Sequence, residues 1–191
     1  ESPWYKICGE EFVEKAFQYA HEADPNALLF YNDYNTESAG KRDRIYKMLK
    51  GLLDKKVPVH GVGLQAHWSI FSPTEQELRQ SIEKFSSLGL QIQFTELDIS
   101  VYKSEHSRRE RRADESDTFT PEMEAKQIEQ YKMAFKVFRE YKDKITGVTF
   151  WNVSDKSTWL DNFPVRGRKN YPLLFDQNLE PKKAYWEVVR F

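Results

Sequence analysis

The 191-residue chain is 39% hydrophobic, 15% aromatic and 31% charged, a composition that can bury a sizeable core and argues against a coiled coil or a disordered tail. Lys and Arg (29) nearly balance Asp and Glu (30), so no overall field favours a nucleic acid or an anionic membrane as partner. No apolar run approaches the ~20 residues of a spanning helix. A single cysteine, Cys8, excludes an internal disulfide framework and a cysteine-rich metal site.

Periodicity predicts an alternation of helices and strands along the chain. Residues 11–22 place apolar side chains at helical spacing, and the short apolar run 27–31 lies between turn residues, as a buried strand would. The same order then repeats. Further helices are predicted at 41–55, 74–88, 121–141 and 181–190, and further strands at 57–64, 91–99 and 145–151. Strand–helix units of this kind imply a parallel sheet with right-handed crossovers.

Two architectures fit such a pattern, a doubly wound open sheet and a (β/α)8 barrel. No glycine-rich phosphate loop follows any predicted strand, which counts against the nucleotide-binding open sheets. Polar and aromatic residues instead collect where each strand ends, at Asn32, Asp33, Tyr34 and Asn35, at Gln65 and His67, at Glu96 and Asp98, and at Trp151, Asn152 and Asp155. A barrel gathers its strand ends around one mouth, so these clusters would face a common site. A complete barrel has about 250 residues and eight units, whereas this chain has four.

Several motifs carry a resemblance to a known family. YNDYN, GVGLQAHW, FTELDIS and GVTFWNVSDKSTWL, followed by PLLFD and PKKAY, stand in the order and spacing of the second half of glycoside hydrolase family 10, the endo-β-1,4-xylanases. The resemblance covers the chain from about Trp4 to Tyr185. It implies that residues 1–191 form the C-terminal half of a catalytic (β/α)8 barrel, strands five to eight.

The resemblance also implies roles for the strand-end residues. In this family of retaining glycosidases one carboxylate attacks the anomeric carbon, and a second, ~5–5.5 Å away, protonates the leaving oxygen and later activates water. Glu96 matches the nucleophile, His67 would lie beside it, and Asp98 would orient that histidine. The matches to substrate-binding residues are Gln65 near the same centre, Trp151 and Trp159 as walls of the sugar site, and Tyr34 and Asn35 on the leaving-group side.

The second catalytic carboxylate is expected outside this chain. The family's acid/base motif, Trp-Asp-x-x-Asn-Glu, does not occur here. Glu10 and Glu11 begin a predicted helix, where acidic side chains favour the helix dipole for structural reasons. The N-terminal half of the same barrel is therefore an expected partner, because four open strands would leave two unpaired edges. We expect the 191 residues alone not to hydrolyse xylan.

Plainer interpretations exist for each residue taken singly. An isolated glutamate at a strand end is usually a solvated loop carboxylate, and tyrosines and tryptophans mostly pack in cores. The alternatives to a xylanase are a non-catalytic carbohydrate-binding half-barrel and a related β-1,4-glucanase. Intact Glu96, His67 and Asp98 favour an enzyme. No His-x-x-x-His or cysteine pair accompanies Gln65 and His67, so no catalytic metal or cofactor is expected.

The charged segment at about 102–118 follows the nucleophile strand and looks like an insertion at the active-site rim. Its arginines alternate with acidic residues, which is typical of a solvated, mobile or ion-paired loop rather than a nucleic-acid site. We expect xylan and xylo-oligosaccharides as ligands, and no nucleic acid or membrane. A polymeric substrate does not cross a membrane intact, so an extracellular or otherwise exported location, periplasmic or on the cell surface, is expected.

Overall fold

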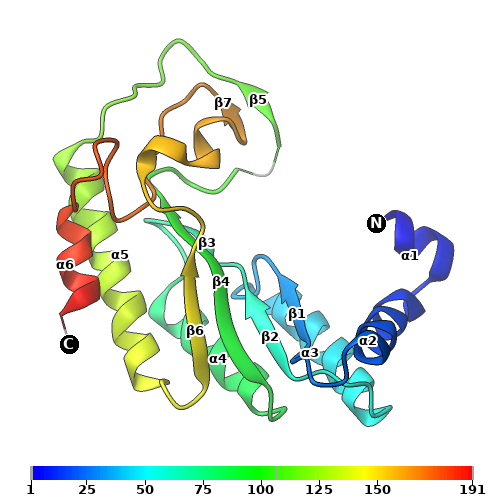
Figure 1. The fold of residues 1–191 in the computed structure, drawn as a ribbon. Helices are drawn as coiled ribbons and strands as arrows, with labels where there is room; N and C mark the ends of the chain where they lie inside the picture. Colours follow the sequence, from blue (N-terminus) through cyan, green and yellow to red (C-terminus); the bar gives the residue numbers. More distant parts are fainter. Residues whose placement is uncertain (1, 106, 191) are drawn as a thin grey trace.

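A computed structural model describes residues 2–105 and 107–190 of the chain. Its centre is a parallel sheet in the order β1 (Phe30–Asp33), β2 (Gly61–Leu64), β4 (Gln91–Ser100) and β6 (Ile145–Phe150), drawn in Figure 1. The short β3 (His67–Ser69) continues the course of β2 and pairs with the upper part of β4. Every strand of this sheet points the same way, so all carboxyl ends reach one edge.

Helices connect the strands, and their ends follow local sequence signals. The chain begins with α1 (Pro3–Cys8) and α2 (Glu11–Ala23), and the crossovers are α3 (Ala39–Asp54), α4 (Glu75–Ser86) and α5 (Pro121–Glu140), with α6 (Lys183–Val189) last. Thr74 caps α4 in a capping box with Glu77. Thr120 caps α5, whose first residue, Pro121, has the fixed φ that suits this position.

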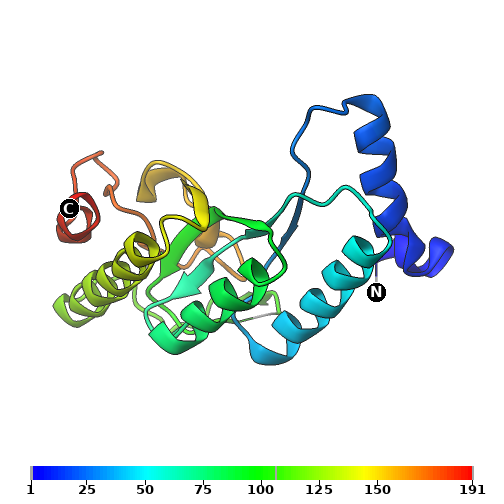
Figure 2. The same ribbon diagram turned by 90° about the horizontal axis from the view of Figure 1, so that it is seen from below.

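The sheet has a helix-covered face and a barrel face. Figure 2 shows α3, α4 and α5 side by side along the first. On β4, Ile92 and Phe94 are buried, whereas Gln91, Gln93 and Thr95, which alternate with them, are partly exposed. Because successive side chains of a strand alternate between its faces, the helices cover the first set, and the second set faces what would be the interior of a closed barrel.

Two predicted strands are shorter than expected. The run 27–31 becomes a strand only from Phe30, and the run 57–64 only from Gly61. Pro58 has no N–H to donate, and the N–H of Val59 bonds back to the carbonyl of Val57, so this part of the chain is not free to join a ladder. Its valines are nevertheless buried, which is why the sequence pattern resembles a strand.

A second small sheet lies at the strand-end side of the molecule. Here β5 (Arg109–Glu110), in the charged segment, pairs in parallel with β7 (Val165–Arg166), and both are drawn above the main sheet in Figure 1. Two short 3-10 helices, η1 (Asp155–Ser157) and η2 (Trp159–Asp161), precede β7. Within the described part of the chain, no helix is both long and apolar enough to cross a lipid bilayer.

Candidate active site

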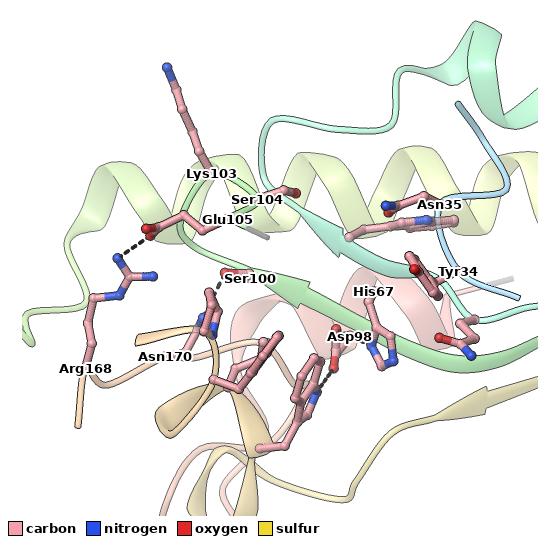
Figure 3. Close-up of a pocket in the computed structure, with 16 residues that line it drawn as sticks. Tyr34, Asn35, His67, Asp98, Ser100, Lys103, Ser104, Glu105, Arg168 and Asn170 are labelled. Carbon is pink, nitrogen blue, oxygen red and sulfur yellow. Dashed lines mark hydrogen bonds and ion pairs between the residues drawn. The ribbon is translucent and has the colours of Figure 1, made fainter. Parts of the chain in front are cut away.

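The strand ends form a cavity at the mouth of the partial barrel. Side chains from the ends of β1, β3 and β4 and from the η2–β7 segment line it, and Figure 3 shows His67 and Asp98 on one side with Tyr34 and Asn35 near them. An adjoining cavity on the α3 side shares Asn35, His67, Trp68 and Ser104 with the first. Of the predicted residues, Tyr34, Asn35, Gln65, His67, Asp98 and Trp159 line the first cavity, and Glu96 and Trp151 contact His67.

Both carboxylate oxygens of Glu96 have a polar partner. Nε2 of His67 lies 3.1 Å from Oε2, and the side-chain amide of Asn32 donates a 3.1 Å hydrogen bond to Oε1. The main-chain N–H of Glu96 donates to the carbonyl of Gln65. Contacts from the ends of β1 and β3 fix the orientation of this carboxylate.

A bulge in β4 explains how Asn32 reaches both Thr95 and Glu96. Phe94 pairs with Val148 and Leu97 with Phe150, so β4 takes one more residue than β6 over this interval. The hydroxyl of Thr95 donates a 2.7 Å hydrogen bond to the side-chain oxygen Oδ1 of Asn32, and the side-chain nitrogen Nδ2 of Asn32 donates to Glu96. Asn32 was not among the predicted site residues, although it belongs to a strand-end polar cluster.

Gly63 makes room for this contact. It lies on β2, between Asn32 on β1 and Thr95 on β4. A methyl group at Gly63 would lie 2.4 Å from Oδ1 of Asn32 and 3.0 Å from Cγ2 of Thr95. The glycine therefore lets a side chain from β1 cross β2 and bond to β4.

His67 lies between two acids. Its Nδ1 is 3.1 Å from Oδ1 of Asp98, close enough for an ion pair but outside hydrogen-bond alignment, while Nε2 faces Glu96. Burial opposes a charge on the imidazole, but the carboxylates of Asp98 and Glu96 outweigh it and raise the pKa of His67. The ring is therefore biased toward the imidazolium form, which would stabilise an ionised Glu96.

Trp159 belongs to the same network. Its indole N–H donates a 2.8 Å hydrogen bond to Oδ2 of Asp98, a carboxylate that is almost fully buried. The ring centroids of Trp159 and His67 are 4.9 Å apart, and Phe163 stacks on the indole at 5.3 Å. The sequence predicts that Trp159 walls the sugar site and does not predict its hydrogen bond to Asp98.

The other aromatic residue at the last strand end is open to solvent. Trp151 is 47% exposed, and its ring meets that of His67 edge-on with centroids 6.2 Å apart. An exposed indole beside polar groups suits a pyranose, because the sugar has apolar C–H faces and a polar rim. The role of Trp151 as a sugar wall stays a prediction, and its exposed position leaves room for it.

Tyr34, Asn35 and Gln65 also border the cavity. Tyr34 is 54% exposed, and the ammonium of Lys41 lies 3.4 Å from its ring centroid. Lys41 also pairs with Asp33 at 2.7 Å, so ring and loop are held together. Asn35 adopts a positive φ of 51°, which an asparagine tolerates and which turns the chain out of β1. The structure brings the predicted site residues to one mouth.

A buried ion pair supports the loop beyond Trp151. Oδ2 of Asp155 lies 3.0 Å from the ammonium of Lys182, and its Oδ1 accepts the main-chain N–H of Leu173. Burial raises the pKa of Asp155 to about 6, although Lys182 and the Leu173 N–H act against it. Burial likewise lowers the pKa of Lys182. Among the described residues, no three His, Cys, Asp or Glu side chains are grouped so as to hold a metal ion.

Fold and site together define a partial (β/α)8 barrel with a carboxylate–imidazole site at its mouth. The family model for glycosyl hydrolase family 10 matches residues 1–191, and the chain belongs to this family. The resemblance stated from the sequence motifs is thereby confirmed, as is the barrel fold.

Characterised relatives lie close in sequence and in structure. The chain is 51% identical over 190 residues to a β-1,4-xylanase of Dictyoglomus thermophilum and 51% identical over 188 residues to an endo-1,4-β-xylanase of Geobacillus stearothermophilus. These matches cover 100% and 98% of this chain but 53% and 56% of the relatives. A crystal structure of a Paenibacillus barcinonensis xylanase with a conduramine derivative superposes with a TM-score of 0.92 at 49% identity, covering 99% of this chain and 56% of that one. The chain thus spans about half the length of the relatives it matches.

Proposed function

We propose that this chain is the nucleophile-bearing half of an endo-acting retaining xylanase, which cleaves internal β-1,4-xylosidic bonds of xylan. The observation that carries the proposal is the double support of Glu96, which Asn32 contacts through one oxygen and His67 through the other. A carboxylate oriented in this way at a barrel mouth, beside exposed aromatic rings, fits a nucleophile better than a solvated strand-end residue. The xylanase names of the relatives supply the substrate.

In the proposed reaction Glu96 attacks the anomeric carbon, and the C1–O bond to the leaving sugar breaks. A second carboxylic acid, about 5–5.5 Å away, protonates that oxygen and then takes a proton from the water that releases the xylosyl–enzyme. His67 holds positive charge beside Glu96 while the nucleophile is ionised, and Asp98 and Trp159 hold His67 in place. We place the second acid in the N-terminal half of the barrel.

The proposed sugar contacts divide between aromatic faces and amides. Trp151 and Trp159 would wall the sugar that bears the attacked carbon, with Gln65 near its hydroxyls. Tyr34 and Asn35 would hold the leaving-group side. Tyr34 is well suited because Lys41 braces its ring while half of its surface stays exposed.

The N-terminal half of the barrel is the proposed partner of this chain. In the described sheet, β1 pairs only with β2, and β6 only with β4, so each has an edge without a strand partner. Large apolar side chains on the first two helices and the loop after them, Trp4, Tyr5, Ile7, Tyr19 and Leu28, are at least 40% exposed. Trp186 on α6 is likewise 48% exposed. Completion of the barrel would cover both edges.

We also propose export of the complete enzyme, because its polymeric substrate lies outside the cell.

The test is reducing-sugar release from xylan by the protein extended through the N-terminal strands. Glu96→Gln should abolish release, whereas Glu129→Gln, at an exposed carboxylate on α5, should not. The 191 residues alone should release nothing. Release from cellulose at a comparable rate would point to a glucanase, and a folded, inactive extended protein that still binds xylan would point to a sugar-binding half-barrel.

A further inference from the structure

The acidic residues of the rim segment 102–118 are largely engaged by arginines. Glu105 and Glu115 both pair with Arg109, at 2.6 Å and 2.5 Å, and both pair with Arg168 beyond β7 at 2.8 Å. Asp117 pairs with Arg111 at 2.8 Å. Hydrogen bonding to Arg109 lowers the pKa of both glutamates, so they remain ionised and neutralised. The segment is therefore an ion-paired structure fastened to β7, which agrees with one of the alternatives left open by its sequence.

Two cations of this segment are placed differently. Lys103 and Arg108 form no ion pair with a carboxylate among the described residues. Each lies instead against an aromatic ring: the ammonium of Lys103 is 5.7 Å from the ring centroid of Phe71, and the guanidinium of Arg108 is 5.6 Å from that of Phe163. Their positive charges are thus left available at the rim.

One of these rings lines the cavity at the barrel mouth, and the other lies against Lys103, which borders the same cavity. Phe163 lines it and stacks on Trp159, the partner of Asp98. Phe71 is 48% exposed at the tip of a tight turn, closed by reciprocal main-chain hydrogen bonds between Ser69 and Ser72. An aromatic ring held on such a turn needs no ordering before it binds a ligand.

Lys103 itself borders the cavity through its base. Figure 3 shows its side chain extending outward from the rim, away from His67 and Asp98. A charge in this place cannot contact the sugar that Glu96 attacks. It can contact a group that projects outward from a bound xylan chain.

We propose that Phe71 and Phe163, with Lys103 and Arg108, form a rim subsite for a carboxylate-bearing sugar substituent of the xylan chain. The proposal rests on the proposed function above. The rings would take the apolar face of the substituent, and the cations its carboxylate. Acidic groups near the site are already paired: Glu105 with two arginines, and Glu122, near the Phe71 side, with Lys126 at 2.7 Å. Because Glu105 and Glu122 are already paired, neither of them competes with an acidic substituent for Lys103 or Arg108.

The test compares two substrates of equal backbone length, a neutral xylo-oligosaccharide and one that carries a single uronic acid. The measured quantity is the acidic-to-neutral ratio of kcat/KM for the N-terminally extended protein. Lys103→Gln or Arg108→Gln should lower this ratio by about fivefold, the effect of losing one exposed charge pair of ~1 kcal/mol. Lys103→Arg keeps the positive charge and should keep the ratio of the unsubstituted protein. Lys132→Gln, at an exposed lysine on α5, should leave the ratio unchanged. The ratio of the unsubstituted protein should fall as salt rises.

An unchanged ratio in both Gln variants overturns the proposal. So does an equal loss on both substrates, because this would indicate a purely structural role. Inactivity of the extended protein on every xylan would refute the proposed function instead. In that case calorimetry on the Glu96→Gln form still tests the subsite. If substitution of Lys103 weakens binding of the acidic oligosaccharide but not of the neutral one, the subsite is supported. If the acidic oligosaccharide binds equally well with and without Lys103, the subsite is overturned.

Discussion

Gly63 is the position where a single methyl group should separate Asn32 from Glu96, the proposed nucleophile. In the structure that methyl would meet Oδ1 of Asn32 at 2.4 Å, well inside van der Waals contact. Asn32 has to move, because the neighbour on the other strand, Thr95, is itself within 3.0 Å of the added group. Gly63→Ala is therefore expected to break the hydrogen bond from Asn32 to Glu96 without touching Glu96 directly.

The size of the effect follows from that hydrogen bond. A hydrogen bond to a charged group contributes about 1.5–3 kcal/mol, and loss of this amount from the transition state lowers kcat/KM by roughly 10- to 150-fold. Overpacking between β1 and β4 should also lower the free energy of unfolding by about 1–3 kcal/mol. The catalytic loss should exceed what a uniform loosening of the fold would cause.

The assay is kcat/KM on xylo-oligosaccharides, with unfolding in urea measured in parallel. Gly51→Ala is the matched control, since a methyl group there, on the exposed side of α3, meets nothing within 4 Å. Asn32→Ala should give a loss similar to Gly63→Ala, and the double variant should be no worse than Asn32→Ala alone, because the two substitutions act on one contact. Full activity of a folded Gly63→Ala protein, or additive losses in the double variant, would refute this account.

Three further outcomes are expected. His67 has a raised pKa, so its contribution to the free energy of unfolding is complete below pH 6.5 and is lost as pH rises through its folded pKa; NMR titration of the imidazole, against a His67→Asn variant in unfolding experiments, checks the sign. Trp159→Phe keeps the ring but removes the N–H donated to Asp98, and should lower kcat more than it raises KM; an effect on KM alone contradicts the network role. Lys182→Met leaves the buried carboxylate of Asp155 without its cation and should cost about 3–5 kcal/mol in urea unfolding, most of which Lys182→Met/Asp155→Asn should recover.

The sequence located the site because strand ends are recognisable from pattern. Glu96 and Asp98 follow a buried alternating run, and His67 follows another, so parallel pairing alone brings them to one edge. Their mutual contacts through His67 were implied by the family motifs rather than by periodicity. In the structure His67 lies 3.1 Å from both carboxylates, and the roles of the three residues stay a prediction.

Two contacts of the site could not be predicted from the sequence pattern. The link from Asn32 to Glu96 depends on the absence of a side chain at Gly63 and on a bulge after Phe94, and neither can be seen in a hydrophobic period. The hydrogen bond of Trp159 to Asp98 joins residues 61 positions apart, across a loop of irregular structure. Contacts of this kind depend on side-chain reach in three dimensions, which periodicity does not specify.

The same geometry indicates how the catalytic work would divide between the two halves of the barrel. The contacts that orient Glu96 in the described structure come from β1, β3 and β4 and the loop carrying Trp159, so this chain by itself orients the proposed nucleophile. The proton donor is a separate requirement, since a retaining reaction needs its acid on the other side of the bond. Substitution of Asn32 or Gly63 should therefore slow attack by Glu96 whatever the leaving group. Loss of the proposed acid should lower the cleavage rate least for leaving groups that need no proton. Comparison of a good and a poor leaving group would separate the two halves kinetically.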